Sequence, residues 1–304
     1  MLSVIIPSYN EEQMISMTAK TISDVLVSEN IDHEILFVND GSSDKTWDII
    51  CEEAKKDPHV RGVSFSRNFG KEAAVFAGLS EAAGDACVVI DCDLQHPPEK
   101  IPEMYRLWEQ GYEVVEGVKN SRGQESGVHK KAAETFYKLI SRATKIDMSR
   151  ASDFKLMDRR VVDTIISMPE KKAFFRAVSS WVGYKKTRVE FDVAERVAGE
   201  SKWSRGALIR YAISNITAFS SFPVRFASYV GIAMIAAFIV IGIFAICIGA
   251  GGNPTGGMFL GLLAFMFLIG GIVLLAIGIV GYYVARTYEE TKGRPRYIVS
   301  EKIN

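Results

Sequence analysis

The first third of the chain repeats one pattern four times: a short apolar run, a polar turn, and then a segment with helical spacing. The apolar runs are 2–6, 34–38, 60–64 and 86–90, and the first three are followed by helical patterns that reach about Ser28, Lys56 and Ala83. Strands that alternate with helices of this length are typical of parallel sheets joined by right-handed crossovers. The pattern therefore predicts an α/β domain.

The fourth apolar run ends in two acidic residues, Asp91 and Asp93. Side chains two residues apart on a strand point to the same side, so the two carboxylates are expected to face one spot. Carboxylate oxygens suit Mg²⁺ or Mn²⁺, and ligands of α/β sheets gather beyond the carboxyl ends of the strands. The alternative is that both acids only begin a polar turn before Pro97 and Pro98, because so short a motif also occurs by chance.

Further elements are expected beyond this point. They are a helix over 101–110, a strand over 112–117, a loop over 119–128, a helix over 130–144, a helix ending at Met168, a helix over 174–182 and a strand over 187–193. The loop is interpreted as a mobile cover of the site, although an ordinary surface loop has the same composition.

The last third contains two long apolar runs, 227–249 and 258–284, and no Asp, Glu, Lys or Arg between Arg225 and Arg286. Each run exceeds the ~20 residues that a helix needs to cross a bilayer. A pair of buried core helices is the competing interpretation, but such helices normally keep a polar face. The sequence thus predicts a transmembrane hairpin, preceded by an interfacial helix over 205–219 that could otherwise be a plain core-facing helix.

Charge and cysteine content suggest where the chain works. Basic residues precede the first apolar run and follow the second, so both termini and the α/β domain are expected in the cytoplasm. The four cysteines lie in apolar settings without metal-binding spacing, which fits a reducing compartment and no disulfide. The formal net charge is zero and gives no reason to expect a nucleic-acid partner. The predicted location is the cytoplasmic membrane, crossed twice.

A third acid, Asp40, follows the second predicted strand and is expected at the same sheet edge as Asp91 and Asp93. The chain has neither Gly-x-Gly-x-x-Gly nor Gly-x-x-x-x-Gly-Lys-Ser/Thr, so a backbone cradle for phosphates is not predicted. A carboxylate-bound divalent cation stabilises a departing diphosphate instead. These residues favour a nucleoside-diphosphate donor, and the apolar hairpin favours a lipid acceptor.

Several motifs together resemble a known family. They are 4–12 (VIIPSYNEE), 38–44 (VNDGSSD), 66–71 (SRNFGK), 91–95 (DCDLQ), 152–157 (SDFKLM), 181–183 (WVG), 195–203 (ERVAGESKW) and 286–292 (RTYEETK). In this order they resemble family 2 glycosyltransferases of the GT-A fold. The resemblance is strongest to the polyprenyl-phosphate branch, which contains dolichol-phosphate mannose synthases and bacterial bactoprenol (undecaprenyl-phosphate) glucosyltransferases.

The resemblance implies a domain plan and a reaction. A GT-A domain with a mixed, Rossmann-like sheet would span 1–195, a juxtamembrane loop and interfacial helix 196–224, two transmembrane helices 225–285, and a cytoplasmic basic tail 286–304. The reaction would be an inverting, metal-dependent transfer of one sugar, glucose from UDP-glucose, to undecaprenyl or another polyprenyl phosphate of the cell envelope. A Gln-x-x-Arg-Trp motif of processive synthases is absent from the sequence.

The resemblance also assigns roles to individual residues. Those around the nucleotide and donor would be Pro7, Tyr9, Glu11, Asp40, Asp91, Asp93 and Gln95. Asp91 and Asp93 would hold Mg²⁺ or Mn²⁺. Those that meet phosphates of the donor or acceptor would be Arg122, Arg196, Ser201 and Lys202, although basic residues beside a membrane can simply bind anionic lipid.

Asp93, Asp153 and Lys202 are the expected catalytic residues. The acceptor phosphate is already ionised near neutral pH, so it needs little help from a general base. Asp153 is the base candidate of the family pattern, and a structural role as a helix cap is equally compatible with its position. His96 is expected beside the metal-binding acids without being required for ligation.

Other donors fit the same pattern, namely GDP-mannose, UDP-N-acetylglucosamine or a UDP-amino-arabinose derivative. A non-catalytic membrane scaffold is the rival from another class, and the intact acids Asp40, Asp91 and Asp93 argue against it. The expected partners are the nucleotide sugar, the polyprenyl phosphate lipid and the membrane. A homo-oligomer is expected too, and the product would pass to a flippase and a downstream transferase.

Overall fold

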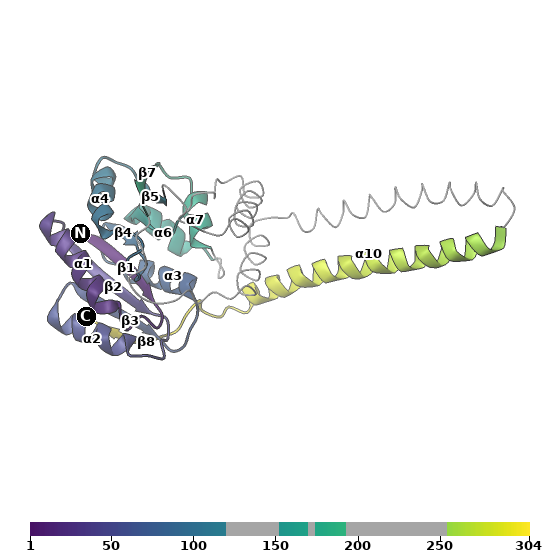
Figure 1. The fold of residues 1–304 in the computed structure, drawn as a ribbon, viewed down its shortest axis with the longest axis horizontal. Helices are drawn as coiled ribbons and strands as arrows, with labels where there is room; N and C mark the ends of the chain where they lie inside the picture. Colours follow the sequence, from purple (N-terminus) through teal and green to yellow (C-terminus); the bar gives the residue numbers. More distant parts are fainter. Residues whose placement is uncertain (120–151, 170–173, 193–253) are drawn as a thin grey trace. The chain divides into compact units, whose positions relative to one another are not determined.

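The computed structural model describes residues 1–119, 152–169, 174–192 and 254–304 (Figure 1). The chain divides into two compact units, Met1–Ala212 with Pro295–Asn304, and Ile213–Arg294. The expected loop over 119–128, apart from its first residue, and the helices over 130–144 and 205–219 lie outside the described residues.

The first unit is built on one mixed sheet of eight strands in the order β7-β5-β6-β4-β1-β2-β3-β8. The strands are β1 (Leu2–Ser8), β2 (His33–Asn39), β3 (Val60–Phe65), β4 (Ala86–Val89), β5 (Val114–Lys119), β6 (Lys155–Asp158), β7 (Lys186–Phe191) and β8 (Val299–Ile303). β1 pairs in parallel with β2 and β4, and β2 with β3, as the alternation of strands and helices predicts. β6 is antiparallel to both its neighbours, which makes the sheet mixed.

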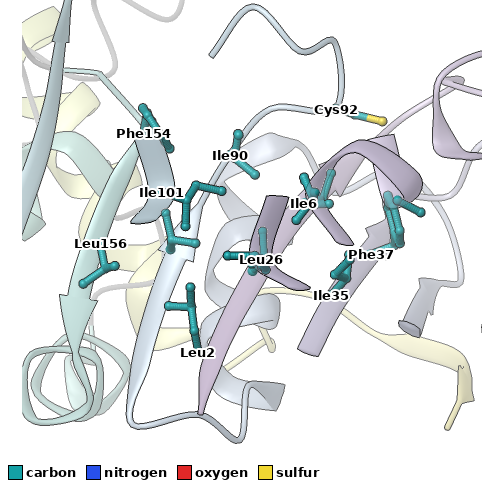
Figure 2. Close-up of a cluster of buried hydrophobic side chains, with 14 of the residues drawn as sticks. Leu2, Ile6, Leu26, Ile35, Phe37, Ile90, Cys92, Ile101, Phe154 and Leu156 are labelled. Atoms are coloured by element: carbon teal, nitrogen blue, oxygen red, sulfur yellow. The ribbon is translucent and has the colours of Figure 1, made fainter. Parts of the chain in front are cut away.

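Helices cover both faces of this sheet. They are α1 (Ile15–Ser28), α2 (Thr46–Lys56), α3 (Lys71–Glu81), α4 (Ile101–Glu109) after a 3₁₀ turn at Pro98–Lys100, α6 (Arg159–Ser167) and α7 (Phe175–Trp181). Side chains of α1, α2 and α4 pack with alternate residues of β1 and β2 in one core cluster, part of which Figure 2 shows. α3 packs on the other face, with Leu36, Val38 and Val63. Burial on both faces explains why the central residues of β1 and β2 form continuous apolar runs.

Close packing of α3 on the sheet depends on a small residue. A Cβ atom added at Gly78 would lie 2.2 Å from Cγ2 of Ile5 on β1. The helix therefore sits directly against the central strand, and this fixes the position of its first residue, Lys71, at the carboxyl edge of the sheet.

The sheet edge beyond β3 is formed by the chain's last residues. β8 pairs antiparallel with β3, with Gly62 opposite Ile303 and Ser64 opposite Glu301. Tyr297, just before β8, stacks on Phe65 with 5.0 Å between the ring centroids. From the sequence, these residues are expected to form a basic tail, and the strand is not predicted.

The second apolar run falls within helix α10 (Pro254–Thr291), and the first run lies outside the described residues. Many side chains of α10 also lie outside the description. Among the residues that are described, no helix is found that is long and apolar enough to cross a membrane. The transmembrane hairpin stays a prediction from the sequence.

Candidate active site

The acids predicted to form the site lie where the parallel strands end. Ile90 continues β4 by donating its backbone N–H to Ile5 of β1, and Asp91 follows directly. Asp40 follows β2, and its backbone N–H donates to the carbonyl of Ser8 at the end of β1. Parallel strands share the direction of their carboxyl ends, so β1, β2 and β4 bring Asp40 and Asp91 to one edge of the sheet.

β6 brings Asp153 to the same edge. Its register with β4 pairs Val89 with Lys155, and because the two strands are antiparallel, Asp153 precedes β6 next to where β4 ends. The predicted metal-binding region and the predicted base candidate thus converge, although 62 positions separate Asp91 from Asp153 in the sequence.

Lys71 connects these two acids. Its Nζ atom lies 2.5 Å from Oδ1 of Asp91 and 2.9 Å from Oδ2 of Asp153. Lys71 is the first residue of α3, and its side chain is 39% exposed. Lys71 is the last residue of the 66–71 motif, and no role is predicted for it from the sequence.

Asp153 is also held by Arg176 of α7. The Nε atom of Arg176 donates to Oδ1 of Asp153 at 2.7 Å, and Nη2 donates to Oδ2 at 2.8 Å. Burial alone would raise the pKa of Asp153, but the positive charges of Lys71 and Arg176 and their hydrogen bonds hold this pKa well below its usual range. An acid that stays ionised so strongly is a poor proton acceptor and a good anchor for cations.

Asp91 shares this electrostatic environment. Burial raises its pKa, and the charge of Lys71, followed by that of His96, lowers it to a net value below the ordinary one. The Nδ1 atom of His96 lies 3.9 Å from Oδ2 of Asp91, and its ring stacks on Phe154. His96 therefore lies beside the acid.

A third carboxyl group, Glu72, lies next to Lys71 on α3. It accepts the backbone N–H of Phe175, the first residue of α7, at 2.8 Å. Burial, and then the negative charge of Asp153, raise the pKa of Glu72 to about 7. Glu72 thereby joins the start of α3 to the start of α7, the two helices that supply Lys71 and Arg176.

A buried ion pair between β6 and β5 contacts α7. Lys155 and Glu116 are almost fully buried and lie 2.8 Å apart, between β6 and β5. The Nζ atom of Lys155 also donates to Oγ of Ser179 on α7 at 2.9 Å, and Oγ of Ser180 donates to the carbonyl of Arg176 at 3.0 Å. The bond to Ser179 ties α7, the helix that carries Arg176, to β6.

Asp40 has a role in holding the loop before α3. Its carboxylate accepts the backbone N–H groups of Phe69 and Gly70, and its side chain is buried. Burial raises its pKa more than the two hydrogen bonds lower it. Gly41 has φ +62°, and a Cβ there would meet the backbone of Arg67 at 2.3 Å, so the two loops approach closely.

The other predicted donor residues lie around the ends of β1 and β4. Pro7 is in β1, Tyr9 is 39% exposed, and the backbone N–H of Glu11 donates to Oγ1 of Thr46. Asp93 accepts the backbone N–H of Gln95 through Oδ1 at 3.2 Å, which orders the turn after β4.

The remaining predictions fall where the structure gives no account. Arg122, Arg196, Ser201 and Lys202 lie outside the described residues. Among the described residues, no group of three or more His, Cys, Asp or Glu side chains is placed to hold a metal ion. Two carboxylates at the end of β4 remain as the candidate ligands.

Lys71, Glu72 and Arg176 are the site residues that sequence reasoning missed. The one signal for Lys71 was its place directly after the turn at 66–70, at the start of a helix that follows a parallel strand. Arg176 and Glu72 had none, because only the packing of α7 against α3 brings them to Asp153.

Comparisons with known proteins identify the family of the chain. The sequence profile described as "Glycosyl transferase family 2" matches residues 3–166. "Uncharacterized glycosyltransferase YkcC" of Bacillus subtilis (strain 168) is 41% identical over 300 residues, covering 98% of this chain and 93% of that protein. "Prophage bactoprenol glucosyl transferase homolog" of Escherichia coli (strain K12) is 40% identical over 301 residues, covering 98% of each chain.

A solved structure shares the fold. It is glucosyl-3-phosphoglycerate synthase from Mycobacterium tuberculosis in complex with Mn²⁺ and UDP-glucose, which superposes with a TM-score of 0.50 at 22% sequence identity over 72% of this chain and 78% of that one. The profile match covers most of the residues that build the site, and the two relatives match over nearly their whole length. The chain is a glycosyltransferase and belongs to glycosyl transferase family 2.

Proposed function

We propose that this glycosyltransferase moves one glucose from UDP-glucose to a polyprenyl phosphate, with inversion at the anomeric carbon. The observation that carries the proposal is the 40% identity to a bactoprenol glucosyl transferase homolog over 98% of both chains. The family profile ends at residue 166, so this likeness includes the C-terminal residues that a general family 2 domain does not account for. Those residues contain the two apolar runs.

The donor end of the site is assigned to Asp91 and Asp93. Their oxygens are the hard ligands that Mg²⁺ and Mn²⁺ prefer, and Asp91 already attracts one cation, the ammonium group of Lys71. Mg²⁺ is commonly held by one or two carboxylates together with substrate phosphates, so this donor set fits without a third acid. When bound, the divalent ion would offset the negative charge that develops on the departing diphosphate.

The acceptor phosphate serves as the nucleophile. One of its ionised oxygens forms the bond to the anomeric carbon while the bond from that carbon to the β-phosphate oxygen of UDP breaks, and UDP leaves with the electron pair. No proton has to be removed from the nucleophile. The strongly ionised state of Asp153 suits this scheme, because its task is then to hold Lys71 and Arg176 as positive charges between two polyanions.

The acceptor side is assigned to Arg122, Arg196, Ser201 and Lys202, and the lipid tail to the bilayer. We place the protein in the cytoplasmic membrane, anchored by the two apolar runs, with the glycosyltransferase domain and both termini in the cytoplasm. The charge-free stretch between Arg225 and Arg286 and the basic residues outside it support this arrangement.

Mass spectrometry of the lipid product tests the proposal. The full-length protein is incubated with undecaprenyl phosphate, Mg²⁺ or Mn²⁺, and one nucleotide sugar at a time from a panel of UDP-glucose, UDP-N-acetylglucosamine, GDP-mannose and a UDP-amino-arabinose derivative. We expect a lipid-linked hexose with UDP-glucose only. The matched control is Asp93→Asn, which keeps the size of the side chain and should reduce transfer by orders of magnitude, about 10²-fold or more.

Two results would contradict the assignment. If lipid-linked product forms with another donor and not with UDP-glucose, the assignment of glucose as the transferred sugar is wrong. If the Asp93→Asn variant keeps near-normal turnover at saturating metal, the assignment of Asp93 as a metal ligand is wrong.

A further inference from the structure

Lys71 occupies a position between two acids that belong to different parts of the site. Asp91 follows β4 and is the candidate metal ligand, whereas Asp153 precedes β6 and is bound to Arg176. The backbone before Lys71 is held in place, because the N–H groups of Phe69 and Gly70 donate to the buried Asp40. Any movement of the ammonium group must therefore come from rotation of the lysine side chain.

A divalent ion on Asp91 would meet Lys71 directly. The Nζ atom lies 2.5 Å from Oδ1 of Asp91, and a metal bound to this carboxylate would place a double positive charge within a few ångströms of the ammonium group. Like charges at this distance repel strongly in a partly buried site. Lysine has a long, flexible stem, so its charge can be moved without displacing the helix.

Asp153 offers the displaced ammonium group a second partner. Its Oδ2 atom already lies 2.9 Å from Nζ of Lys71, and the side chain of Asp153 is only 8% exposed. Arg176 binds both oxygens of Asp153 and keeps the carboxylate in one orientation. The lysine can thus leave Asp91 and stay paired, which a single-partner lysine could not do.

We propose that Lys71 competes with the divalent cation for Asp91 and shifts onto Asp153 when the cation binds. The inference rests on the metal site of the proposed function and deepens it, since it makes Lys71 and Asp153 positioning residues for metal entry. Binding of the cation at the donor end then changes the surroundings of Asp153 and Arg176 on the other side of the site.

Binding of Mn²⁺ alone, without nucleotide, tests the competition. The full-length protein and its variants are titrated with Mn²⁺, and free Mn²⁺ is followed by electron paramagnetic resonance. The Lys71→Gln variant lacks the competing charge and should bind Mn²⁺ about tenfold more tightly than the wild type. Lys71→Arg retains a charge that can pair with both acids and should stay within about twofold of the wild type.

Lys302→Gln is the matched control. Lys302 also forms an ion pair with a glutamate of α3, Glu81, but at the far end of that helix from Lys71. Its Mn²⁺ affinity should equal that of the wild type. Thermal unfolding of each variant shows whether the fold persists.

A double-mutant cycle with Asp153 separates competition from simple charge effects. Asp153→Asn leaves Asp91 as the carboxylate partner of Lys71, so Mn²⁺ should bind about five- to tenfold more weakly. In the Lys71→Gln background the same substitution should change the affinity by less than about twofold. If Asp153 acted on the metal only through its own charge, it would have the same effect in both backgrounds.

The inference is overturned if Lys71→Gln binds Mn²⁺ no more tightly than the wild type, or if the effect of Asp153→Asn is equal in both backgrounds. It is also overturned if neither wild type nor Lys71→Gln binds Mn²⁺. The Mn²⁺ titrations do not test the sugar or the acceptor of the proposed function, because the mass of the lipid product tests these separately. Failure of the inference and failure of the proposed function are therefore distinguishable.

Discussion

At the scale of single residues, the site is dominated by charges that hold each other. Asp91, Lys71, Asp153 and Arg176 form a chain of ion pairs with contact distances between 2.5 and 2.9 Å. Removing one partner from this partly buried chain leaves an uncompensated charge, which costs more than the pair itself contributes. The chain therefore constrains geometry, and its ionised acids are suited to bind cations.

Glu72 provides a pH-dependent prediction at this scale. Its pKa is about 7 in the folded protein, above the ordinary value of 4.5, so the folded state keeps a proton that the unfolded chain loses between these values. Protonated Glu72 makes its full contribution to the free energy of unfolding below pH 4.5, and this contribution is lost as the pH rises through 7. Glu72→Gln should match the wild type near pH 4.5 and be more stable at about pH 8, by on the order of 1–2 kcal/mol.

Urea unfolding at several pH values measures this difference. Glu103→Gln serves as the control for the removal of a glutamate charge, because Glu103 is about half exposed on α4. A Glu72→Gln variant whose stability falls with pH as steeply as that of the wild type would contradict the assignment.

At the scale of elements, the sequence predicted the parallel strands and their helices well. The apolar runs of β1, β2, β3 and β4 and the helical spacing of α1, α2 and α3 are local signals that survive in the fold. β6 was missed because it is only four residues long and contains Lys155, whose burial depends on Glu116 of a neighbouring strand. β8 was missed because its side chains are mostly polar and its strand form depends on pairing with β3.

Local signals in the sequence also predict part of the site. Asp40 and Asp91 follow apolar strands, and the topology of parallel strands places both at one edge. The contacts between Lys71, Asp153 and Arg176 depend on how α3 and α7 pack, and no spacing in the sequence reports that packing.

Removal of β8 gives a prediction for an element. Deleting residues 299–304 would expose the backbone groups of β3 and remove the contacts of Ile303 with the core. We expect the glycosyltransferase domain to lose on the order of 3 kcal/mol of unfolding free energy and to aggregate more readily. Chemical unfolding and light scattering measure the two effects.

Glu301→Gln is the control for this deletion. It keeps the strand and can still accept the hydrogen bond from Nε1 of Trp47, so its unfolding free energy should change by less than about 0.5 kcal/mol. If the deletion were as mild as this substitution, β8 would not be a structural part of the sheet.

At the scale of the whole molecule, the membrane topology that we propose rests on the distribution of charge along the sequence. A cysteine introduced by Asn253→Cys lies in the uncharged segment between the two apolar runs. An impermeant thiol reagent should label it from the periplasmic or outer side of sealed vesicles only. The control is Glu99→Cys on the exposed surface of the glycosyltransferase domain, which should be labelled only from the cytoplasmic side. Labelling of Asn253→Cys from the cytoplasmic side would mean that the hairpin is re-entrant or inverted.

The most direct measurement of the central claim is the structure of the product. The full-length protein, UDP-glucose, a divalent cation and undecaprenyl phosphate are combined, and the extracted lipid is characterised by mass spectrometry and NMR. Glucose is α-linked in UDP-glucose, and the proposed attack of the acceptor oxygen comes from the opposite face, so we expect one glucose in β-linkage to the lipid phosphate. An α-linked glucose, several sugars on one lipid, or free glucose without any lipid-linked sugar would contradict the account.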